Sequence, residues 1–194
     1  MKTKRMDYID WDTMFMGMAA IASMRSKDPD TQNGALIVEP DTKIVKAVGY
    51  NGLPPLCSDD TFPWDRDSKD PYDSKYSYVI HAEANAFNNR YGSVRGCHLY
   101  LYSSKGYPPC AICAQTIAAN RISEVIMAAQ IKTNTDVYNW KPTMRIFQNA
   151  GIKLRIIERS SFCFTTLSHE FQTCSRKVDE VNYPETKNET EACK

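Results

Sequence analysis

The fold is decided by residues 97–128, which read CHLYLYSSKGYPPCAICAQTIAANRISEVIMA. The aromatic and aliphatic run at 97–102 predicts a strand, the segment from about 110 to about 120 predicts a helix, and the apolar run at 123–128 predicts another strand. Strands that alternate with helices are typical of a layered α/β sheet, so the sequence predicts this fold class.

The flanking segments extend the same alternation. Apolar residues at helical spacing predict a helix at 11–25, with Asp10 or Asp12 as its N-cap. The other predicted elements are strands at 34–39 and 43–50 joined as a hairpin by Pro40–Thr42, helices at 81–90 and 141–149, and a strand at 152–157. Between them, residues 51–76 are rich in Pro, Asp and Ser and predict one long loop, which in a compact domain is usually functional.

Length and charge exclude several classes of protein. A chain of 194 residues with 42% hydrophobic residues is sufficient for one globular domain. Its 24 basic and 23 acidic residues argue against a nonspecific nucleic-acid coat protein. The longest apolar stretch, Met14–Ala22, is too short to span a membrane, and acidic residues interrupt any signal-peptide pattern. Seven cysteines, an odd number, indicate a reduced intracellular protein.

The domain boundaries follow from the same patterns. Residues 1–157 are predicted to form the globular domain, and 158–178 a C-terminal extension. Residues 179–194 carry five acidic and two basic residues and almost nothing apolar, which predicts a mobile acidic tail.

One constellation carries chemistry. His81 and Glu83 open one predicted helix, and Pro109, Cys110 and Cys113 open the next. Two thiolates and one imidazole are the three ligands of a catalytic zinc, because the fourth tetrahedral position stays free for water. Glu83, two residues after a ligand, is placed to move protons. Taken alone, the pair Cys110 and Cys113 is as consistent with a structural zinc site or a redox-active pair as with a catalytic zinc site. The full pattern is the signature of zinc nucleobase deaminases.

Beyond this signature, the chain resembles the deoxycytidylate (dCMP) deaminases over roughly residues 10–157. The signature alone would also admit cytidine, guanine, riboflavin-pathway and tRNA-adenosine deaminases. The stretches that narrow the resemblance are SKDPDTQNGALIV at 26–38, GYNGLP at 49–54, CSDDTFPWDR at 57–66 and KYSYVIHAEANA at 75–86.

The resemblance implies a cytidine-deaminase-like three-layer α/β/α sandwich with a central five-stranded mixed sheet. It also implies hydrolysis of dCMP to dUMP and ammonia, in which water activated by Zn²⁺ attacks C4 and Glu83 shuttles protons, supplying dUMP for thymidylate synthesis. By the same resemblance, Asn51 would bind the sugar and base, and the backbone N–H groups of Ala82 and Cys110 would meet the pyrimidine.

The resemblance further implies allosteric regulation, with dCTP as activator and dTTP as inhibitor, each bound with Mg²⁺. It also implies that the protein is a hexamer and is located in the cytoplasm, or in the host cytoplasm if the protein is viral. The candidate effector residues are Arg25, Lys27, Asp28, Asn33, Gly52, Asp60, Trp64 and Arg66.

Two departures from the family pattern leave substrate and regulation open. The connection Tyr102–Pro108 is longer than usual, in a loop that normally forms part of the base pocket, so a 5-substituted dCMP, or dCTP as well as dCMP, is an alternative substrate. Asn33 stands where a small apolar residue is usual, which would alter regulation or abolish it.

Two other classes of function compete with this interpretation. A tRNA adenosine deaminase would need a basic groove, which a net charge of +1 does not favour. A catalytically inactive, zinc-stapled nucleotide-binding protein would have no use for Glu83. The other cysteines, and His98 and His169, are not expected to bind metal.

Overall fold

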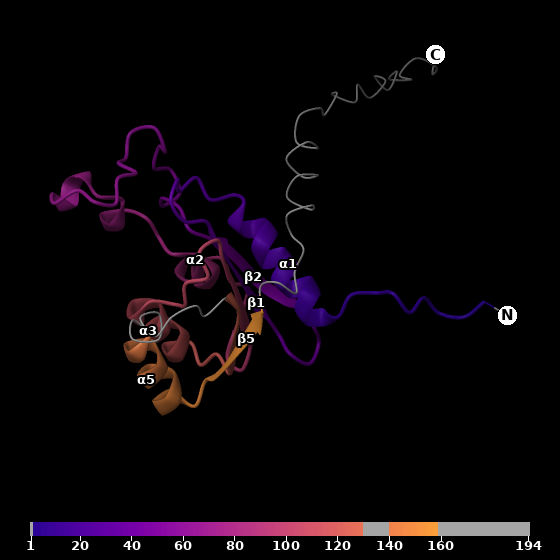
Figure 1. Ribbon diagram of the computed structural model, residues 1–194. Helices are drawn as coiled ribbons and strands as arrows, with labels where there is room; N and C mark the ends of the chain where they lie inside the picture. Colours follow the sequence, from indigo (N-terminus) through magenta and orange to yellow (C-terminus); the bar gives the residue numbers. More distant parts are fainter. Residues whose placement is uncertain (1, 130–139, 159–194) are drawn as a thin grey trace, which may run out of the picture. The chain divides into compact units, whose positions relative to one another are not determined.

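The computed structural model describes residues 2–129 and 140–158 (Figure 1). Within these ranges the strands are β1 (Asn33–Val38), β2 (Val45–Tyr50), β3 (His98–Ser103), β4 (Glu124–Ala129) and β5 (Lys153–Glu158). The α-helices are α1 (Trp11–Ser23), α2 (Ala82–Asn88), α3 (Ala111–Ala119) and α5 (Lys141–Ala150). The predicted α/β alternation is confirmed.

The strands form one mixed sheet in the order β2-β1-β3-β4-β5. The pairs β2-β1 and β1-β3 are antiparallel, and β3-β4 and β4-β5 are parallel. The predicted hairpin is confirmed, but its second strand begins at Val45 rather than at 43. Lys43 adopts a left-handed φ of 61° in the connection, which ends the extended run there.

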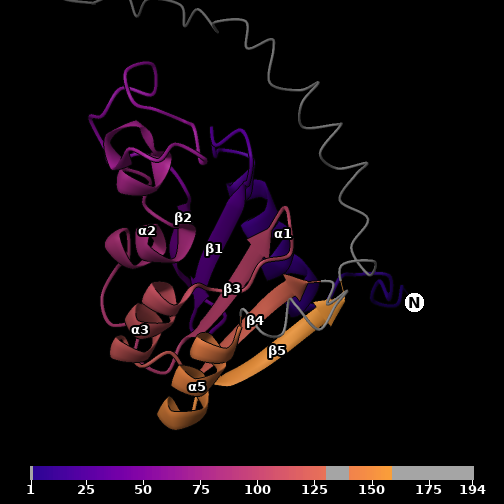
Figure 2. The ribbon, with the colours of Figure 1, turned by 60° about the vertical axis from the view of Figure 1, so that its left-hand side comes forward.

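Helices cover both faces of the sheet, so the structure has three layers. The side chain of Asp10 caps α1 by accepting a hydrogen bond from the backbone N of Thr13 at 2.7 Å. Phe15 and Met16 of α1 pack with Leu36 and Tyr100 in a core on one face. Figure 2 shows α1 on this side of the sheet and α2, α3 and α5 on the other.

The core under α2, α3 and α5 positions the functional helices. Leu99 and Leu101 of β3 pack there against Ala82 of α2 and Ala114 of α3. Gly49 of β2 permits the close approach of α2, because a Cβ built on it would lie 2.3 Å from the backbone N of Ala86. Main-chain contact therefore sets the height of α2 above the sheet.

The segment 51–76 is more ordered than the prediction of one long loop. It contains the short 3-10 helix η1 (Pro71–Asp73) and runs into η2 (Lys75–Ser77). Gly52 forms an antiparallel bridge with Ile80, which closes the base of the segment. Asp70 and Ser74 cap the two helices through side-chain hydrogen bonds. These polar caps stabilise the two short helices, which have no periodic apolar pattern.

None of the helices in the part that the structure describes is both long and apolar enough to cross a membrane. The predicted extension 158–178, apart from Glu158 at the end of β5, and the predicted acidic tail 179–194 lie outside the described residues, as do His169, Cys163 and Cys174. Cys57 and Cys97, which are described, are free thiols, as predicted.

Candidate active site

The first side of the site is the start of α2. His81 is the N-cap residue of this helix, and Glu83 lies in its first turn. Two side-chain amides tie the outer face of α2 to β2: Asn85 Nδ2 donates to the Tyr50 carbonyl at 2.8 Å, and Asn89 Nδ2 donates to the Val48 carbonyl at 3.1 Å. With the close contact at Gly49, these bonds give His81 and Glu83 a defined position over the sheet.

The second side is the start of α3. Cys110 is its N-cap, and the Cys110 Sγ accepts a hydrogen bond from the backbone N of Cys113 at 3.4 Å. The preceding residue, Pro109, is buried, and its carbonyl accepts a 2.8 Å hydrogen bond from Thr143 Oγ1 of α5. The Cys pair is therefore held both by its own helix and by the neighbouring helix α5.

The structure brings the three predicted ligands together. His81 Nδ1 lies 3.5 Å from Cys110 Sγ and 3.3 Å from Cys113 Sγ, and the three ligand atoms lie within 4.8 Å of one another. Tetrahedral bonds of about 2.0 Å to nitrogen and about 2.3 Å to sulfur would place an N and an S ligand about 3.6 Å apart. The donor set and its spacing thus fit one zinc ion.

Glu83 lies beside these ligands without joining them. Its side chain is only 4% exposed, and burial raises the pKa of its carboxyl above the usual range. A carboxyl group held in this way can accept a proton and release it again, which is the property that the sequence analysis assigned to Glu83.

The pKa values of the two thiols are shifted in opposite directions. The hydrogen bond from Cys113 and the contact with His81 lower the pKa of Cys110 to about 3. The hydrogen bond with Cys110 and burial raise the pKa of Cys113. The contact with Cys110 also raises the pKa of His81, so the two thiols and the imidazole titrate as one coupled group. A metal cation that binds here displaces the protons of this group.

Asn51, the predicted substrate residue, is 4% exposed and holds the entry to β1. Its Oδ1 accepts from the backbone N of Asn33 at 2.8 Å, and its Nδ2 donates to the Thr31 carbonyl at 2.9 Å and to Asp28 Oδ2 at 3.4 Å. The position of this side chain therefore depends on the turn that precedes β1.

The candidate effector residues lie in different surroundings. Lys27 pairs with Asp59, and Trp64 Nε1 donates to the Asp59 carbonyl at 3.0 Å, so the segment after α1 meets the loop 57–66. Asp28, in contrast, is 5% exposed and inside the protein. The other candidates are Arg25, Asp60 and Arg66, which are exposed, Gly52, which pairs with Ile80, and Asn33, which begins β1.

Sequence reasoning missed Lys75. This side chain is 4% exposed, and its Nζ lies 2.6 Å from Asp28 Oδ1 and 2.6 Å from Asp30 Oδ2. Burial by itself lowers the pKa of Lys75, but the two carboxylates outweigh it and raise that pKa. A lysine in a charge-rich segment carries no sign that it is buried, so only the structure could identify this link.

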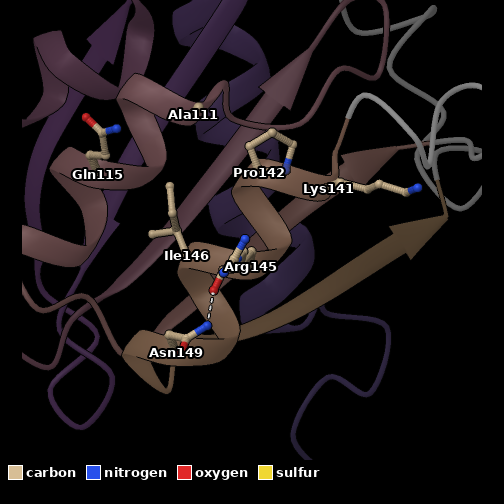
Figure 3. A pocket seen from close by; sticks show the side chains of 7 residues that line it. All are labelled: Ala111, Gln115, Lys141, Pro142, Arg145, Ile146 and Asn149. Carbon is tan, nitrogen blue, oxygen red and sulfur yellow. Dashed lines mark hydrogen bonds between the residues drawn. The ribbon is translucent and has the colours of Figure 1, made fainter.

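A cavity of about 580 Å³ lies between α3 and α5 (Figure 3). It is lined by Ala111 and Gln115 of α3 and by Lys141, Pro142, Arg145, Ile146 and Asn149 of α5. None of these is one of the four residues of the His/Cys/Cys and Glu cluster. The cavity is therefore beside the site and not its mouth.

A mixed sheet with helix starts that offer one imidazole, two thiols and a buried carboxyl group defines the class of zinc-dependent hydrolases with a cytidine-deaminase-like fold. Residues 9–129 match the family model of the cytidine and deoxycytidylate deaminase zinc-binding region. The chain belongs to this family, as the sequence resemblance predicted.

Curated relatives agree with this assignment. The deoxycytidylate deaminase of Mus musculus is 46% identical over 153 residues, and that of Homo sapiens is 40% identical over 153 residues. Each alignment covers 78% of this chain and 82% of the relative.

This chain is similar to the crystal structure of the dCMP deaminase from the cyanophage S-TIM5 in complex with dCMP and dUMP. The TM-score between the two chains is 0.53, and their sequences are 21% identical. The match covers 74% of this chain and 94% of that one. At this identity, the likeness confirms the three-layer fold.

Proposed function

We propose that this protein catalyses the hydrolytic deamination of dCMP to dUMP and ammonia. The observation that carries the proposal is the cluster of His81, Cys110 and Cys113 with the buried Glu83 beside it. The relatives that share 40% and 46% identity over most of the chain are deoxycytidylate deaminases, which supports dCMP as the substrate.

The residues divide the chemistry between them. Zinc held by His81, Cys110 and Cys113 would lower the pKa of a water molecule to about 7 and so supply the nucleophile. Glu83 accepts one proton of this water and delivers it to N3 of the ring, and it then carries the second proton, from the hydroxyl group added at C4, to the departing amine. Burial, which raises the pKa of Glu83, favours the protonated form that the second half of this transfer needs.

Binding of the base falls to groups around the cluster. The N–H groups in the first turns of α2 and α3 have no acceptor within their helices, so the backbone of Ala82 and Cys110 can meet polar atoms of the pyrimidine. For Asn51 at the end of β2 to bind the sugar and base, its Nδ2 has to exchange one of its hydrogen bonds to Thr31 and Asp28 for one to the substrate. Free nucleotides are favoured over polymers by the net charge of +1.

The substitution Glu83→Gln tests the proposal. It keeps the size of the side chain but cannot carry the proton, so we expect turnover of dCMP to fall by about 10²- to 10⁴-fold at unchanged zinc content. Glu39→Gln, in the hairpin connection, is the matched control and retains full turnover. Ammonia release near the wild-type rate by the Glu83 variant would contradict the assigned role.

A panel of substrates separates the alternatives. We expect ammonia release from dCMP to exceed that from cytidine and from a tRNA adenosine substrate, and we measure dCTP and 5-substituted dCMP alongside. Zinc-loaded protein that releases ammonia from none of them would be the inactive nucleotide-binding protein.

We further propose regulation by dCTP as activator and dTTP as inhibitor with Mg²⁺, and a cytoplasmic hexamer. The contacts of Lys27 and Trp64 with Asp59 support a shared effector surface, since they join the end of α1 to the loop 57–66. We expect dCTP and dTTP to shift the saturation curve for dCMP in opposite directions. Light scattering measures the mass of the assembly. Curves that do not respond, or a monomer mass, would contradict this part.

A further inference from the structure

The half of α1 that faces away from the sheet is apolar. Its inward half packs Phe15, Met16 and Ala19 into the core. Large apolar side chains, three or four residues apart, form a stripe along the outward half: Trp11, Met14, Met18, Ile21 and Met24. Trp11 is 51% exposed, and Ile21 is 41% exposed. Because no charged residue interrupts this α1 stripe, the helix is apolar on both sides.

Such a helix is unusual at a protein surface. A surface helix normally carries charged and polar residues on its outer face, and a helix that is apolar all round is buried. Figure 2 shows that no other described α-helix lies on this face of the sheet. The exposed parts of the side chains in the α1 stripe make up about 300–400 Å² of apolar surface, the size of a patch that is often functional.

The edge strand β2 enlarges this apolar surface. Val48 pairs with Leu36 in the sheet, and Leu36 packs under α1, so Val48 faces the same side of the sheet as α1. Tyr50, two residues later, faces this side as well. Both side chains are more than one third exposed. With them, a contact between two copies of the chain would bury about 1,000 Å², which is the area that a specific interface needs.

The α1 stripe is complementary to itself when two copies of α1 pack antiparallel. With a twofold axis between positions 17 and 18, Met14 lies opposite the partner's Ile21. Gly17 then lies opposite the partner's Met18, and the missing side chain of Gly17 leaves room for this methionine. The centre of the contact can therefore interdigitate as packed helices do.

The same arrangement matches the two ends of the helix. Trp11, whose ring stacks on Phe15 with 5.5 Å between the ring centroids, lies opposite the partner's Met24. Next to this contact, the exposed Asp10 lies opposite the partner's Arg25, which is also exposed. The twofold axis repeats each contact, so opposite charges meet at both ends. A parallel pair would bring like charges together, which is unfavourable.

We propose that the α1 stripe, with Val48 and Tyr50, is an interface that binds a second copy of this chain through antiparallel α1 helices. The partner is a second copy because the apolar positions, the central glycine and the charged ends all match under one twofold axis. An unrelated partner requires no such symmetry. The interface does not depend on the deaminase function, and it would supply one pairwise contact of the proposed hexamer.

The substitution Ile21→Glu tests this interface. It places a carboxylate from each copy in the centre of the contact, while Ile21 is exposed in the single chain, so the far-ultraviolet circular dichroism should not change. We expect the dissociation constant of the pair to rise by about 30-fold or more, the effect of losing one central residue of an interface. Light scattering over a dilution series should then show a mass of half the wild-type value or less. Tyr91→Glu, at a position that is 85% exposed after α2, is the control and keeps the wild-type mass.

Cysteine cross-linking tests the antiparallel register. Under the proposed axis, Met18→Cys lies beside its own copy, so mild oxidation of the zinc-loaded variant should link two chains, which requires Cα atoms within about 7 Å. Met24→Cys lies about 20 Å from its own copy and should not link to itself. It should link to Trp11→Cys when the two variants exchange subunits. Wild-type protein, oxidised in the same way, measures the background from the native cysteines.

The outcomes separate this interface from the other proposals. A wild type that is monomeric at every concentration overturns it. An Ile21→Glu variant of unchanged mass also overturns it, and the proposed hexamer would then form through another surface. A disulfide in Met24→Cys alone overturns the antiparallel arrangement. None of these measurements uses ammonia release, so a failure of the proposed deaminase function is seen separately.

Discussion

Replacing Lys75 with methionine removes the one cation that lies within 4 Å of the carboxylate of Asp28 among residues 2–129 and 140–158. Lys75 and Asp28 are 4% and 5% exposed, and their charged atoms lie 2.6 Å apart. Methionine fills a similar volume without the charge. The carboxylate of Asp28 would then keep its hydrogen bonds from the backbone N atoms of Asp30 and Thr31, at 2.8 and 3.1 Å, but no counter-charge.

The expected loss of stability is large. Removing one partner of a buried ion pair costs about 3–5 kcal/mol, because an uncompensated charge stays inside. For a chain of this size, each kcal/mol lowers the melting temperature by about 2–4 °C, so we expect a fall of roughly 6–20 °C. The matched control is Lys27→Met. Its ion pair with Asp59 is half exposed, and such pairs contribute about 0–1 kcal/mol.

Calorimetry or chemical denaturation of zinc-loaded protein measures the effect. The double variant Lys75→Met with Asp28→Asn is expected to recover part of the loss, since it removes both charges. Because the pKa of Lys75 is raised, its stabilising effect is complete below its unfolded pKa of about 10.4 and is lost only as pH rises through the folded value. A Lys75 variant as stable as the Lys27 variant at pH 7 would refute the reasoning.

The substitution also reaches Asn51, the proposed substrate residue, because Asp28 and the Thr31 carbonyl both accept hydrogen bonds from Asn51 Nδ2. Below its melting temperature, the Lys75 variant should therefore show a raised KM for dCMP. An unchanged KM would mean that Asn51 does not depend on this turn.

Two other predictions follow from packing and charge. Gly49→Ala would place a Cβ 2.3 Å from the backbone N of Ala86 and 2.4 Å from the Ala82 carbonyl oxygen. We therefore expect the free energy of unfolding to fall by about 3 kcal/mol and the zinc affinity to fall as α2 shifts. The control Gly52→Ala, whose Cβ would have its nearest contact at 3.6 Å, should cost much less. The hydrogen bond from Arg155 lowers the pKa of Asp12, so this contact stabilises the fold above the unfolded pKa and is lost as pH falls through the folded value. The melting temperature should hence fall less steeply between pH 5 and pH 3 in Arg155→Gln than in the wild type, and equal slopes would contradict this.

Local patterns were sufficient for most of the elements. The helix at α1, the hairpin of β1 and β2, and the strand-helix-strand unit of β3, α3 and β4 all follow from apolar spacing, which is a property of neighbouring residues. The boundaries shifted by one or two residues, as at the C-terminal end of α1, predicted at 25 and observed at Ser23, and at the start of α3, where Cys110 is the N-cap. The segment 51–76 is the irregular connection that was predicted, apart from two short 3-10 helices near its end, which the sequence did not reveal because helices closed by polar caps carry no apolar period.

The candidate zinc cluster was also accessible from the sequence, since His81, Cys110 and Cys113 stand at spacings that suit one metal, with Glu83 two residues after His81. The burial of Lys75 was not. Its partners Asp28 and Asp30 lie more than forty residues away in the chain, and no local pattern records which charges a fold will bring together.

The sequence by itself determined the class of fold, and it predicted the three candidate zinc ligands and the carboxyl group proposed to carry protons, because each depends on residue type and short-range spacing. Tertiary structure alone decided that Asp28 is buried against Lys75, that Asn51 is held by the turn before β1, and that Asn33 faces Ser103 across two strands. These relations depend on strand register and on the depth at which a charge is buried. Both are set only when distant segments pack together.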